Sequence, residues 1–342
     1  MAKSNYSKIY SDLTKNLPQK TKEVLGRRFG VAKRERETLE SIGEDFGITR
    51  ERVRQIEERG FSQIKEENQE VLDKIYKEFS EYFENKGGLK KEDIILKDLG
   101  GEKDQPYVFF LLTLGGQFLR VCEKKDFHSF WAPSSTTQKE ANNILDLLVK
   151  KLKKDRKILA KKEFVAQCAL EYRLSPAAIL SRLEISKRIK ENKEGKIGLI
   201  EWPEINPKGV KDKAFLVFRK EKKPLHFTEV ADLIDTLKFN LPNRKTVPQT
   251  VHNELIRDPR FVLVGRGKYA LREWGYVPGT VKDVILQVMQ ETKGPLNKEE
   301  IVKKVLSQRY VAANTILINL NDKEHFSKTS EGKYILRKTQ LA

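Results

Sequence analysis

The chain has 342 residues, a formal net charge of +18 and a hydrophobic content of 38%, which together predict two or more folded domains and exclude an intrinsically disordered chain. The two cysteines, Cys122 and Cys168, lie far apart and outside any CxxC pattern, which excludes a disulfide framework and a zinc-finger site. The positive balance favours a polyanionic partner but does not identify one.

Three further classes of protein are disfavoured. The N-terminal segment has no apolar stretch typical of a signal peptide, and the longest apolar run, residues 108–114, is far too short to span a bilayer. The four histidines are scattered, and the sequence contains no Walker A motif and no nuclease core. We therefore expect a cytoplasmic protein that is not an enzyme and has no cofactor, metal site, membrane contact or small-molecule substrate.

Residues 38–64 show the layout of a helix-turn-helix. A first apolar-periodic helix ends at Gly47, because glycine suits the positive φ of a tight turn between helices. Thr49 follows as the expected N-cap of the second helix, where its hydroxyl can accept a hydrogen bond from an orphan backbone N–H. One face of this second helix is apolar and is expected to pack inward: Val53, Ile56, Gly60 and Ile64.

The opposite face of the second helix carries side chains that suit DNA. Glu51 and Gln55 lie one turn apart and are expected to point at base edges, since glutamine can bond adenine and glutamate can accept from cytosine. The arginines beside them can reach phosphates or guanines. An amphipathic helix with merely solvated charges is the alternative, which the preceding helix and turn disfavour. The residues expected to contact DNA are Thr49, Arg50, Glu51, Arg52, Arg54, Gln55 and Arg59.

This segment resembles region 4 of the sigma-70 family of bacterial transcription initiation factors. Residues 17–30 resemble the first helices of that region, and residues 38–57 resemble its helix-turn-helix nearly residue for residue. In that family the second helix enters the major groove of the −35 promoter element, and the region docks on the flap of core RNA polymerase. The resemblance implies that Arg50, Glu51 and Gln55 read bases and that Arg52 and Arg54 support them. It is confined to residues 17–65.

The rest of the chain contains a repeat. Trp131, Trp202 and Trp274 are spaced 71 and 72 residues apart. GKIGLIEW (195–202) aligns without a gap with GKYALREW (267–274), GKYILRK (332–338) matches the start of this element, and DFHSFW (126–131) is a looser first copy. We expect the tryptophans to plug the core of each repeat or its junction to the next, rather than to stack on bases. Upstream, each copy has an anchor leucine: Leu89, Leu159, Leu225 and Leu296.

Each repeat is predicted to hold three helices followed by a β-hairpin, which is the order of a winged helix. In the last repeat the helices are predicted over residues 280–292, with Thr280 as N-cap, 298–307 and 311–320, and the hairpin over 325–336. The third repeat follows the same plan, with helices over 228–237 and 247–255 and a hairpin over 260–271.

The third and fourth repeats also resemble the HARE-type winged helix. That domain occurs in the delta subunit of bacterial RNA polymerase, in some restriction enzymes and in some chromatin proteins. Residues 265–276 carry the likeness best. The resemblance implies contact with nucleic acid or with the transcription machinery, but it assigns no role to any single residue.

The predicted fold is mainly α with small β-hairpin wings, in which a sigma region 4 helix-turn-helix precedes four tandem winged helices. Residues 133–137, 203–209 and 277–279 are expected linkers. Apolar residues keep helical spacing from Phe61 to Phe83, which predicts a nearly continuous helix joining the first two domains. The predicted domains are residues 1–66, 67–133, 138–204, 209–276 and 279–342.

These observations predict a DNA-binding transcription regulator, associated with the bacterial nucleoid in the cytoplasm. It would read a −35-like element in double-stranded DNA and associate with core RNA polymerase. No aromatic-rich helix suited to melting a −10 element is found, so the chain is not expected to open promoters alone.

Two alternatives remain. In the first, the chain is a delta-like, polymerase-associated accessory protein with little base-specific contact. The set of Arg50, Glu51 and Gln55 argues against it, because a docking module needs no base-reading groups. An enzyme such as a nuclease is least favoured, since acid-x-Lys triplets such as residues 194–196 arise by chance in a chain that is 34% charged.

Overall fold

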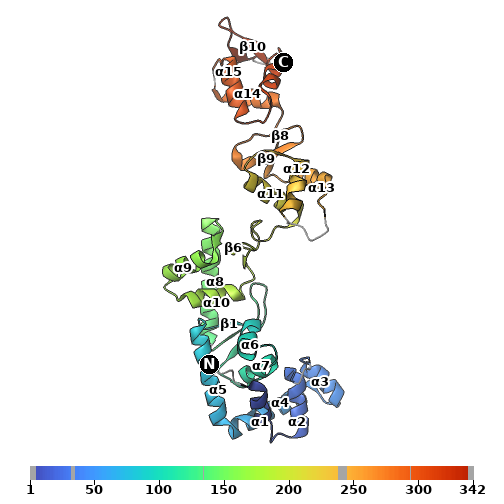
Figure 1. Cartoon of the computed structure of the whole chain (residues 1–342), viewed down its shortest axis with the longest axis vertical. Helices are drawn as coiled ribbons and strands as arrows, with labels where there is room; N and C mark the ends of the chain where they lie inside the picture. Colours follow the sequence, from blue (N-terminus) through green and yellow to red (C-terminus); the bar gives the residue numbers. More distant parts are fainter. Residues whose placement is uncertain (1–4, 32–34, 134, 238–244, 293, 338–342) are drawn as a thin grey trace. The chain divides into compact units, whose positions relative to one another are not determined.

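The computed structural model of the chain describes residues 5–31, 35–133, 135–237, 245–292 and 294–337. They fall into two compact units, Met1–Glu201 (unit 1) and Trp202–Ala342 (unit 2), which are described separately. The described residues are mainly helical with small antiparallel sheets, and they form the predicted series of a helix-turn-helix followed by four winged helices (Figure 1). No described helix is both long and apolar enough to cross a membrane.

Four helices form the N-terminal module, which we call the head. Val24, Ile42 and Val53 are buried together and hold the helix-turn-helix against α2. Gly60 lets α2 and α4 cross closely, because a Cβ at this position would lie 2.7 Å from Cγ2 of Thr21. The helices are α1 (Tyr6–Leu13), α2 (Gln19–Phe29), α3 (Leu39–Phe46) and α4 (Arg50–Glu67).

The four winged helices follow in chain order. Winged helix 1 comprises α5 (Gln69–Asn85), β1 (Lys90–Lys91), α6 (Glu92–Gly100), α7 (Gln105–Leu114), β2 (Leu119–Val121) and β3 (Phe130–Ala132). Winged helix 2 comprises α8 (Ser135–Asp155), β4 (Leu159–Ala160), α9 (Lys161–Tyr172), α10 (Pro176–Ile185), β5 (Ile189–Glu191) and β6 (Lys196–Leu199). Winged helix 3 comprises α11 (Gly209–Glu221), β7 (Leu225–His226), α12 (Phe227–Thr236), α13 (Pro248–Arg257), β8 (Phe261–Gly265) and β9 (Lys268–Leu271). Winged helix 4 comprises α14 (Val281–Thr292), α15 (Lys298–Leu306), α16 (Ala313–Asn319), β10 (Phe326–Lys328) and β11 (Tyr334–Leu336).

One sheet topology recurs. In the first three winged helices the last strand lies between the short first strand and the middle strand, with all pairs antiparallel. In winged helix 4 the short first strand is reduced to a bridge between Leu296 and Tyr334 beside the β10–β11 hairpin. Thr280 caps α14 as predicted, since its Oγ1 accepts a hydrogen bond from the N–H of Asp283 at 3.2 Å.

The strand register corrects the predicted alignment of the first repeat. Leu159 pairs with Ile197 and Leu225 with Tyr269, and the bridge at Leu296 occupies the same place. In winged helix 1 the equivalent pair is Lys90 with Trp131. The anchor position there belongs to Lys90 and not to Leu89, so the predicted copy is shifted by one residue.

The tryptophans are therefore not equivalent. Trp131 lies within β3 itself, whereas Trp202 and Trp274 come after the end of the last strand of their repeats. Trp131 is buried, and Trp274 is half-buried against the core of winged helix 3, as expected for residues that plug a core or a junction. The interval of 71 residues, from Trp131 to Trp202, joins residues at different positions in their repeats. Only the interval of 72 residues, from Trp202 to Trp274, joins residues at equivalent positions.

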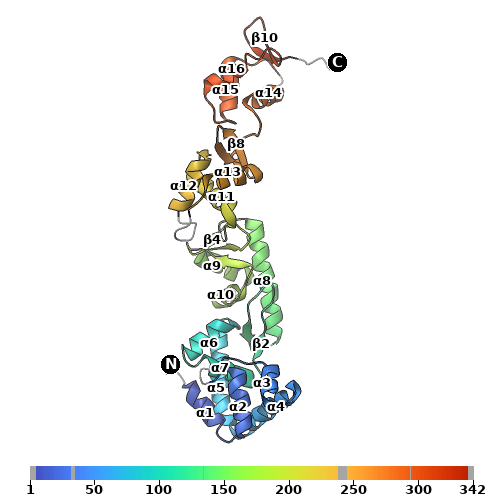
Figure 2. The same cartoon turned by 90° about the vertical axis from the view of Figure 1, so that its right-hand side faces the viewer.

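The head and winged helix 1 share one hydrophobic core. Phe110 of α7 is fully buried, and its ring lies 4.9 Å from Tyr10, 5.2 Å from Phe29 and 5.8 Å from Phe61 between ring centroids. Residues from α1, α2 and α4 thus converge on a single side chain of α7. Both views place α7 among the helices of the head (Figure 2).

The predicted continuous helix between these domains is wrong, because the helix breaks at Asn68. The φ of −131° and ψ of 30° at this residue end α4, and the Asn68 amide donates to the carbonyl of Ile64 at 3.1 Å. Asparagine favours such breaks because its side chain competes for backbone partners. The coupling to the head comes instead from the apolar face of α5, which enters the shared core with Leu72, Ile75, Phe79 and Phe83.

The predicted linker at residues 133–137 is also wrong, since α8 already begins at Ser135. Winged helix 2 packs directly on winged helix 1: the Arg182 guanidinium donates to the carbonyl of Gly87, and Nζ of Lys90 lies 2.8 Å from the Glu184 carboxylate. A Cβ at Gly87 would lie 2.5 Å from backbone atoms of α10, so the two modules approach backbone to backbone. Residues 203–208 and 277–280 have no helix or strand.

We predict that Phe110→Ala lowers the free energy of unfolding of unit 1 by about 3–5 kcal/mol, because it empties the site where the head meets α7. Denaturant unfolding measures the loss, and hydrogen exchange should show lower protection on both α2 and α7. The matched control is Phe218→Ala, whose buried ring belongs to the core of winged helix 3 and should weaken only unit 2. Unchanged protection on α2 in Phe110→Ala would contradict a shared core.

Candidate nucleic-acid interface

The turn between α3 and α4 has the geometry that the sequence predicts. Gly47 adopts a left-handed conformation with φ of 61°, and the N–H of Ile48 donates to the carbonyl of Gly43 at 2.9 Å. Thr49 caps α4, since its Oγ1 accepts from the N–H of Arg52 at 3.2 Å. The start of α4 is thereby held by a cap and a tight turn, which places its first two turns at the surface.

Helix α4 presents its polar face outward. Val53 and Ile64 are buried, and Ile56 is half-buried, so the predicted apolar stripe does pack inward. Gln55 is half-buried at the edge of the polar face. The remaining predicted contact residues are exposed: Thr49, Arg50, Glu51, Arg52, Arg54 and Arg59. The structure therefore brings the predicted set together on one surface, and the contact of each residue with DNA stays a prediction.

The side chains of this face form pairs along the helix. Arg54 donates to both carboxylate oxygens of Glu51, at 2.9 and 2.6 Å, and also pairs with Glu58. Arg52 donates to Oε1 of Gln55 at 3.0 Å. The acceptor oxygens of Glu51 and Gln55 are thus oriented by neighbouring arginines. A base that offers an N–H to Glu51 has to share that carboxylate with Arg54.

The bonds from Arg54 also change the ionisation of Glu51. They are the largest cause of a pKa for Glu51 below its ordinary value, and they raise the pKa of Arg54 in turn. The carboxylate therefore stays ionised to lower pH than a free glutamate. In this state it accepts hydrogen bonds and cannot donate them, which suits the amino group of cytosine.

Arg27 and Arg36 make contacts that sequence reasoning missed, and those of Arg27 hold α3 against α2. Arg27 of α2 donates to Glu37 at 2.9 Å and also pairs with Asp45 at the end of α3. Arg36 lies over the ring of Phe109 in winged helix 1, with 4.3 Å from its guanidinium carbon to the ring centroid. These pairs join residues far apart in the sequence, and nothing in the local pattern of charges singled them out.

Each winged helix contains a helix-turn-helix pair of its own. The four pairs differ in how much of their second helix is exposed to solvent. In a helix-turn-helix the second helix of the pair enters the major groove, and here these helices are α7, α10, α13 and α16. Helix α7 is buried against the head, and α10 is buried against β1 and Gly87. In unit 2, α13 exposes Gln249, Thr250 and Asn253, and α16 exposes Asn314 and Thr315.

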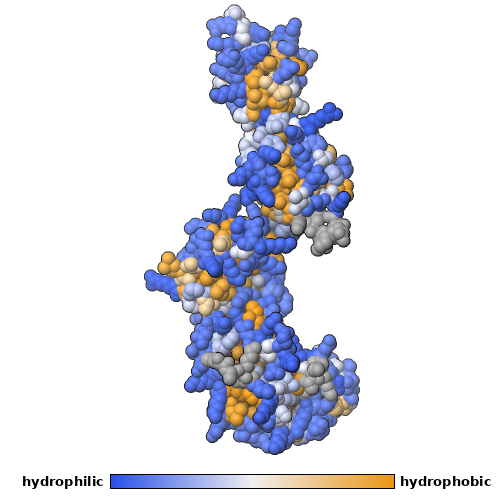
Figure 3. Space-filling view, in the orientation of Figure 1, coloured by the Kyte–Doolittle hydropathy of each residue, from blue (hydrophilic) through white to orange (hydrophobic). Residues whose placement is uncertain are grey.

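These open helices also carry apolar side chains at the surface. Ile256 at the end of α13 is 62% exposed, and Ile318 of α16 is 63% exposed. The space-filling view shows apolar patches on both winged helices of unit 2 (Figure 3). The outer faces of α13 and α16 thus combine uncharged polar groups with apolar ones, unlike the arginine-rich face of α4.

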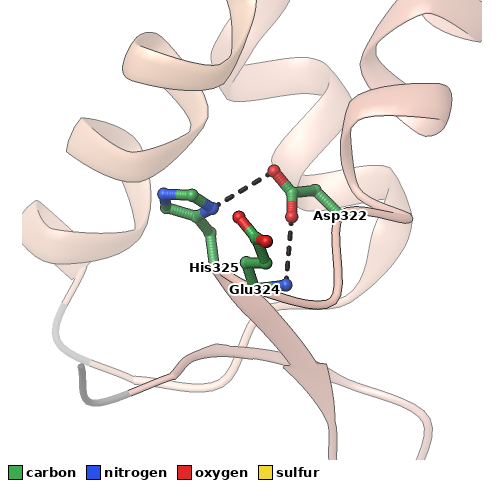
Figure 4. Close-up of side chains that lie close together, drawn as sticks. All are labelled: Asp322, Glu324 and His325. Atoms are coloured by element: carbon green, nitrogen blue, oxygen red, sulfur yellow. Dashed lines mark hydrogen bonds and ion pairs between the residues drawn. The ribbon is translucent and has the colours of Figure 1, made fainter. Parts of the chain in front are cut away.

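Asp322, Glu324 and His325 are the one group of possible metal ligands in the described residues, with ligand atoms within 4.8 Å of one another (Figure 4). The Asp322 carboxylate already accepts from the N–H of Glu324 at 3.0 Å and lies 3.1 Å from Nδ1 of His325. Nζ of Lys282 lies 3.3 Å from the same carboxylate and supplies a positive charge. These contacts explain the cluster as a turn that leads into β10, and we assign no metal to it.

Comparison with protein families matches two parts of the chain. Residues 15–66 match the family model of sigma-70 region 4, and residues 209–274 match that of HARE-HTH, a helix-turn-helix domain whose description includes ASXL and restriction endonucleases. The first match covers α2, α3 and nearly all of α4 but not α1, and the second covers winged helix 3. The chain thus carries a sigma region 4 domain and a HARE-type winged helix, and these domains mark it as a DNA-binding regulatory protein.

We predict that Thr49→Ala costs about 1 kcal/mol of stability, because it removes the acceptor for an orphan N–H at the start of α4. Thermal or denaturant unfolding of the full chain measures the loss. Thr49→Ser is the control, since it keeps the hydroxyl and should remain within a few tenths of a kcal/mol of the parent. Equal stabilities of the alanine and serine variants would contradict the capping role.

We also predict that Arg54→Ala raises the pKa of Glu51 towards its ordinary value, as seen in an NMR titration of the side-chain carboxyl. Because the pKa of Glu51 is lowered in the folded state, the pair stabilises the head above the ordinary carboxyl range and ceases to do so as the pH falls through the lowered pKa. Arg59→Ala, on the same helix, should leave the titration of Glu51 unchanged. An unshifted Glu51 in Arg54→Ala would show that Arg54 does not set its ionisation.

Proposed function

We propose that the chain is a transcription regulator that reads a −35-like element of double-stranded DNA with α4 in the major groove. The observation that carries this proposal is the exposed face of α4, where Arg50, Glu51 and Gln55 project from a helix start fixed by Gly47 and Thr49. A helix of this width fits the major groove, where these residue types distinguish base pairs. The proposal assigns no catalytic reaction to the chain.

Association with core RNA polymerase is the second part of the proposal. It is supported by the match of the head to sigma-70 region 4, a domain of transcription initiation factors. The shared core limits where the polymerase can bind, because the apolar side of α2 and the C-terminal half of α4 is occupied by α7. A polymerase contact therefore cannot use this side of the head.

An accessory protein with little base-specific contact is a second candidate. It is favoured by the burial of α7 and α10, which closes two of the helix pairs of the described chain to DNA. It is also favoured by the exposed apolar residues of α13 and α16, which suit a protein partner. Selection of bound duplexes from a random pool, with and without core polymerase, separates the candidates. An enriched sequence without polymerase supports the reader, and no enrichment in either condition supports the accessory protein.

We predict that Arg50→Ala and Gln55→Ala each cost about 1–3 kcal/mol on the selected duplex and relax the preference at one base pair. Titrations of the selected duplex and of a random duplex measure this loss. The physical reason is that each side chain offers hydrogen bonds to one base edge. If both variants bound the two duplexes with the parent's preference intact, direct readout by α4 would be wrong.

Arg59→Ala tests the other kind of contact. Arg59 lies more than two turns along α4 from Arg50 and is exposed, so we expect it to meet a phosphate. Its removal should weaken binding of all duplexes alike and reduce the salt slope by about 1. A loss confined to the selected duplex would assign Arg59 to base reading instead.

A further inference from the structure

The positive charge of unit 1 lies away from its reading helix. Residues 1–70, which include the head, hold 15 Lys and Arg against 13 Asp and Glu, a net charge of +2. Residues 135–201, which form winged helix 2, hold 16 against 9, a net charge of +7. Affinity for DNA depends on cations that neutralise phosphates, so the head by itself is a weak source of it.

Five of the sixteen cations of winged helix 2 lie close together at the end of α8. Lys150, Lys153 and Lys154 share one face of the last turns of α8, and Arg156 and Lys157 follow directly after its last residue, Asp155. We call these five residues the lysine face. All five are exposed, and none of them forms an ion pair or a side-chain hydrogen bond with another described residue. The opposite side of α8 is buried and fixes this orientation: Leu145, Leu148, Val149 and Leu152.

The neighbouring Lys151 shows what a purely structural lysine looks like here. It is half-buried and lies 2.8 Å from the carboxylate of Glu171 and 3.4 Å from that of Asp155. The carboxylates of Glu171 and Asp155 thus pair with Lys151. The side chains of the lysine face have no ion-pair partner among the described residues. Like charges at spacings of three and four residues repel one another in a helix. A binding partner with many negative charges would offset this repulsion.

In winged helix 2 the helix that would enter the major groove is not accessible to DNA. Its second pair helix, α10, is buried against winged helix 1, with Ser181, Arg182 and Ile185 inside the interface. The C-terminal end of α8 lies away from this interface in both views (Figures 1 and 2). The lysine face is thus a cationic surface that this module leaves open.

We propose that the lysine face binds the phosphate backbone of the same duplex DNA whose bases α4 reads. This inference rests on the proposed function, because it adds a second contact to the same ligand. Phosphate contacts position a protein on the duplex without reading its sequence. The head would then choose the site, and winged helix 2, held in the same compact unit, would supply much of the salt-dependent affinity.

The test is the full-length variant K150Q/K153Q/K154Q, measured on the selected duplex and on a random duplex over a range of salt concentrations. The slope of log K against log salt should become shallower by about 1–3, and affinity at 0.1 M salt should fall at least about tenfold. The loss should be equal on both duplexes, so that the preference for the selected one is unchanged. Glutamine is a good helix former, and circular dichroism should show α8 intact.

The matched control is K74Q/K77Q/K103Q, which removes three exposed lysines from winged helix 1 in the same unit. It makes the same change in net charge and should leave the salt slope close to that of the parent. The proposal is overturned if the two triple variants have the same slope. It is also overturned if the lysine-face variant loses affinity for single-stranded RNA of equal length and not for the duplex.

The experiments distinguish failure of the phosphate contact from failure of base reading by α4. If the Arg50 and Gln55 variants keep the parent's sequence preference while the lysine-face variant has a shallower slope, base reading by α4 fails and the phosphate contact stands. If those variants lose preference while the lysine-face variant behaves like its control, base reading stands and the phosphate contact fails.

Discussion

The organisation of unit 1 depends on the burial of α7 between the head and the rest of winged helix 1. Phe110 is enclosed by rings from three helices of the head, and the surrounding positions of α7 are also apolar. Removing such a set of aromatic rings from water is the largest favourable contribution available to a module of this size. Its consequence is that the helix-turn-helix has a set orientation on winged helix 1 and is not tethered to it by a flexible segment.

Burial of a helix between neighbouring modules also occurs between winged helices 1 and 2. It determines which surfaces of the chain remain exposed. Because α10 is buried on β1 and Gly87, winged helix 2 belongs to the same compact unit and its helix pair is closed. The chemistry that suits DNA in unit 1 is then split between the polar face of α4 and the lysine face of α8. In unit 2 the helices α13 and α16 remain open, with uncharged polar and apolar surfaces that suit a different partner.

Several elements could be predicted because their signals are local. Gly47 and Thr49 specify the turn and the cap of α4 through backbone geometry and one hydrogen bond, and Thr280 does the same for α14. The β-hairpins of winged helices 3 and 4 were visible from strand periodicity around a glycine. The errors arose where periodicity was extended across a residue with its own preference. Asn68 breaks an apolar pattern that continues on both sides of it, and Trp131 matches the spacing of later tryptophans from a different position in its strand.

By itself the sequence determined the character of the chain: a helix-turn-helix whose second helix carries polar side chains, followed by repeated winged helices. Residues 15–66 and 209–274 match known families. These features follow from side chains that act within a few residues of one another. Only the tertiary structure decided which helix pairs are open, because the burial of α7 and α10 depends on a neighbouring module. It also decided that the five cations at the end of α8 are uncompensated, because an ion pair requires an acid brought close by folding, and here the nearby acids pair with Lys151.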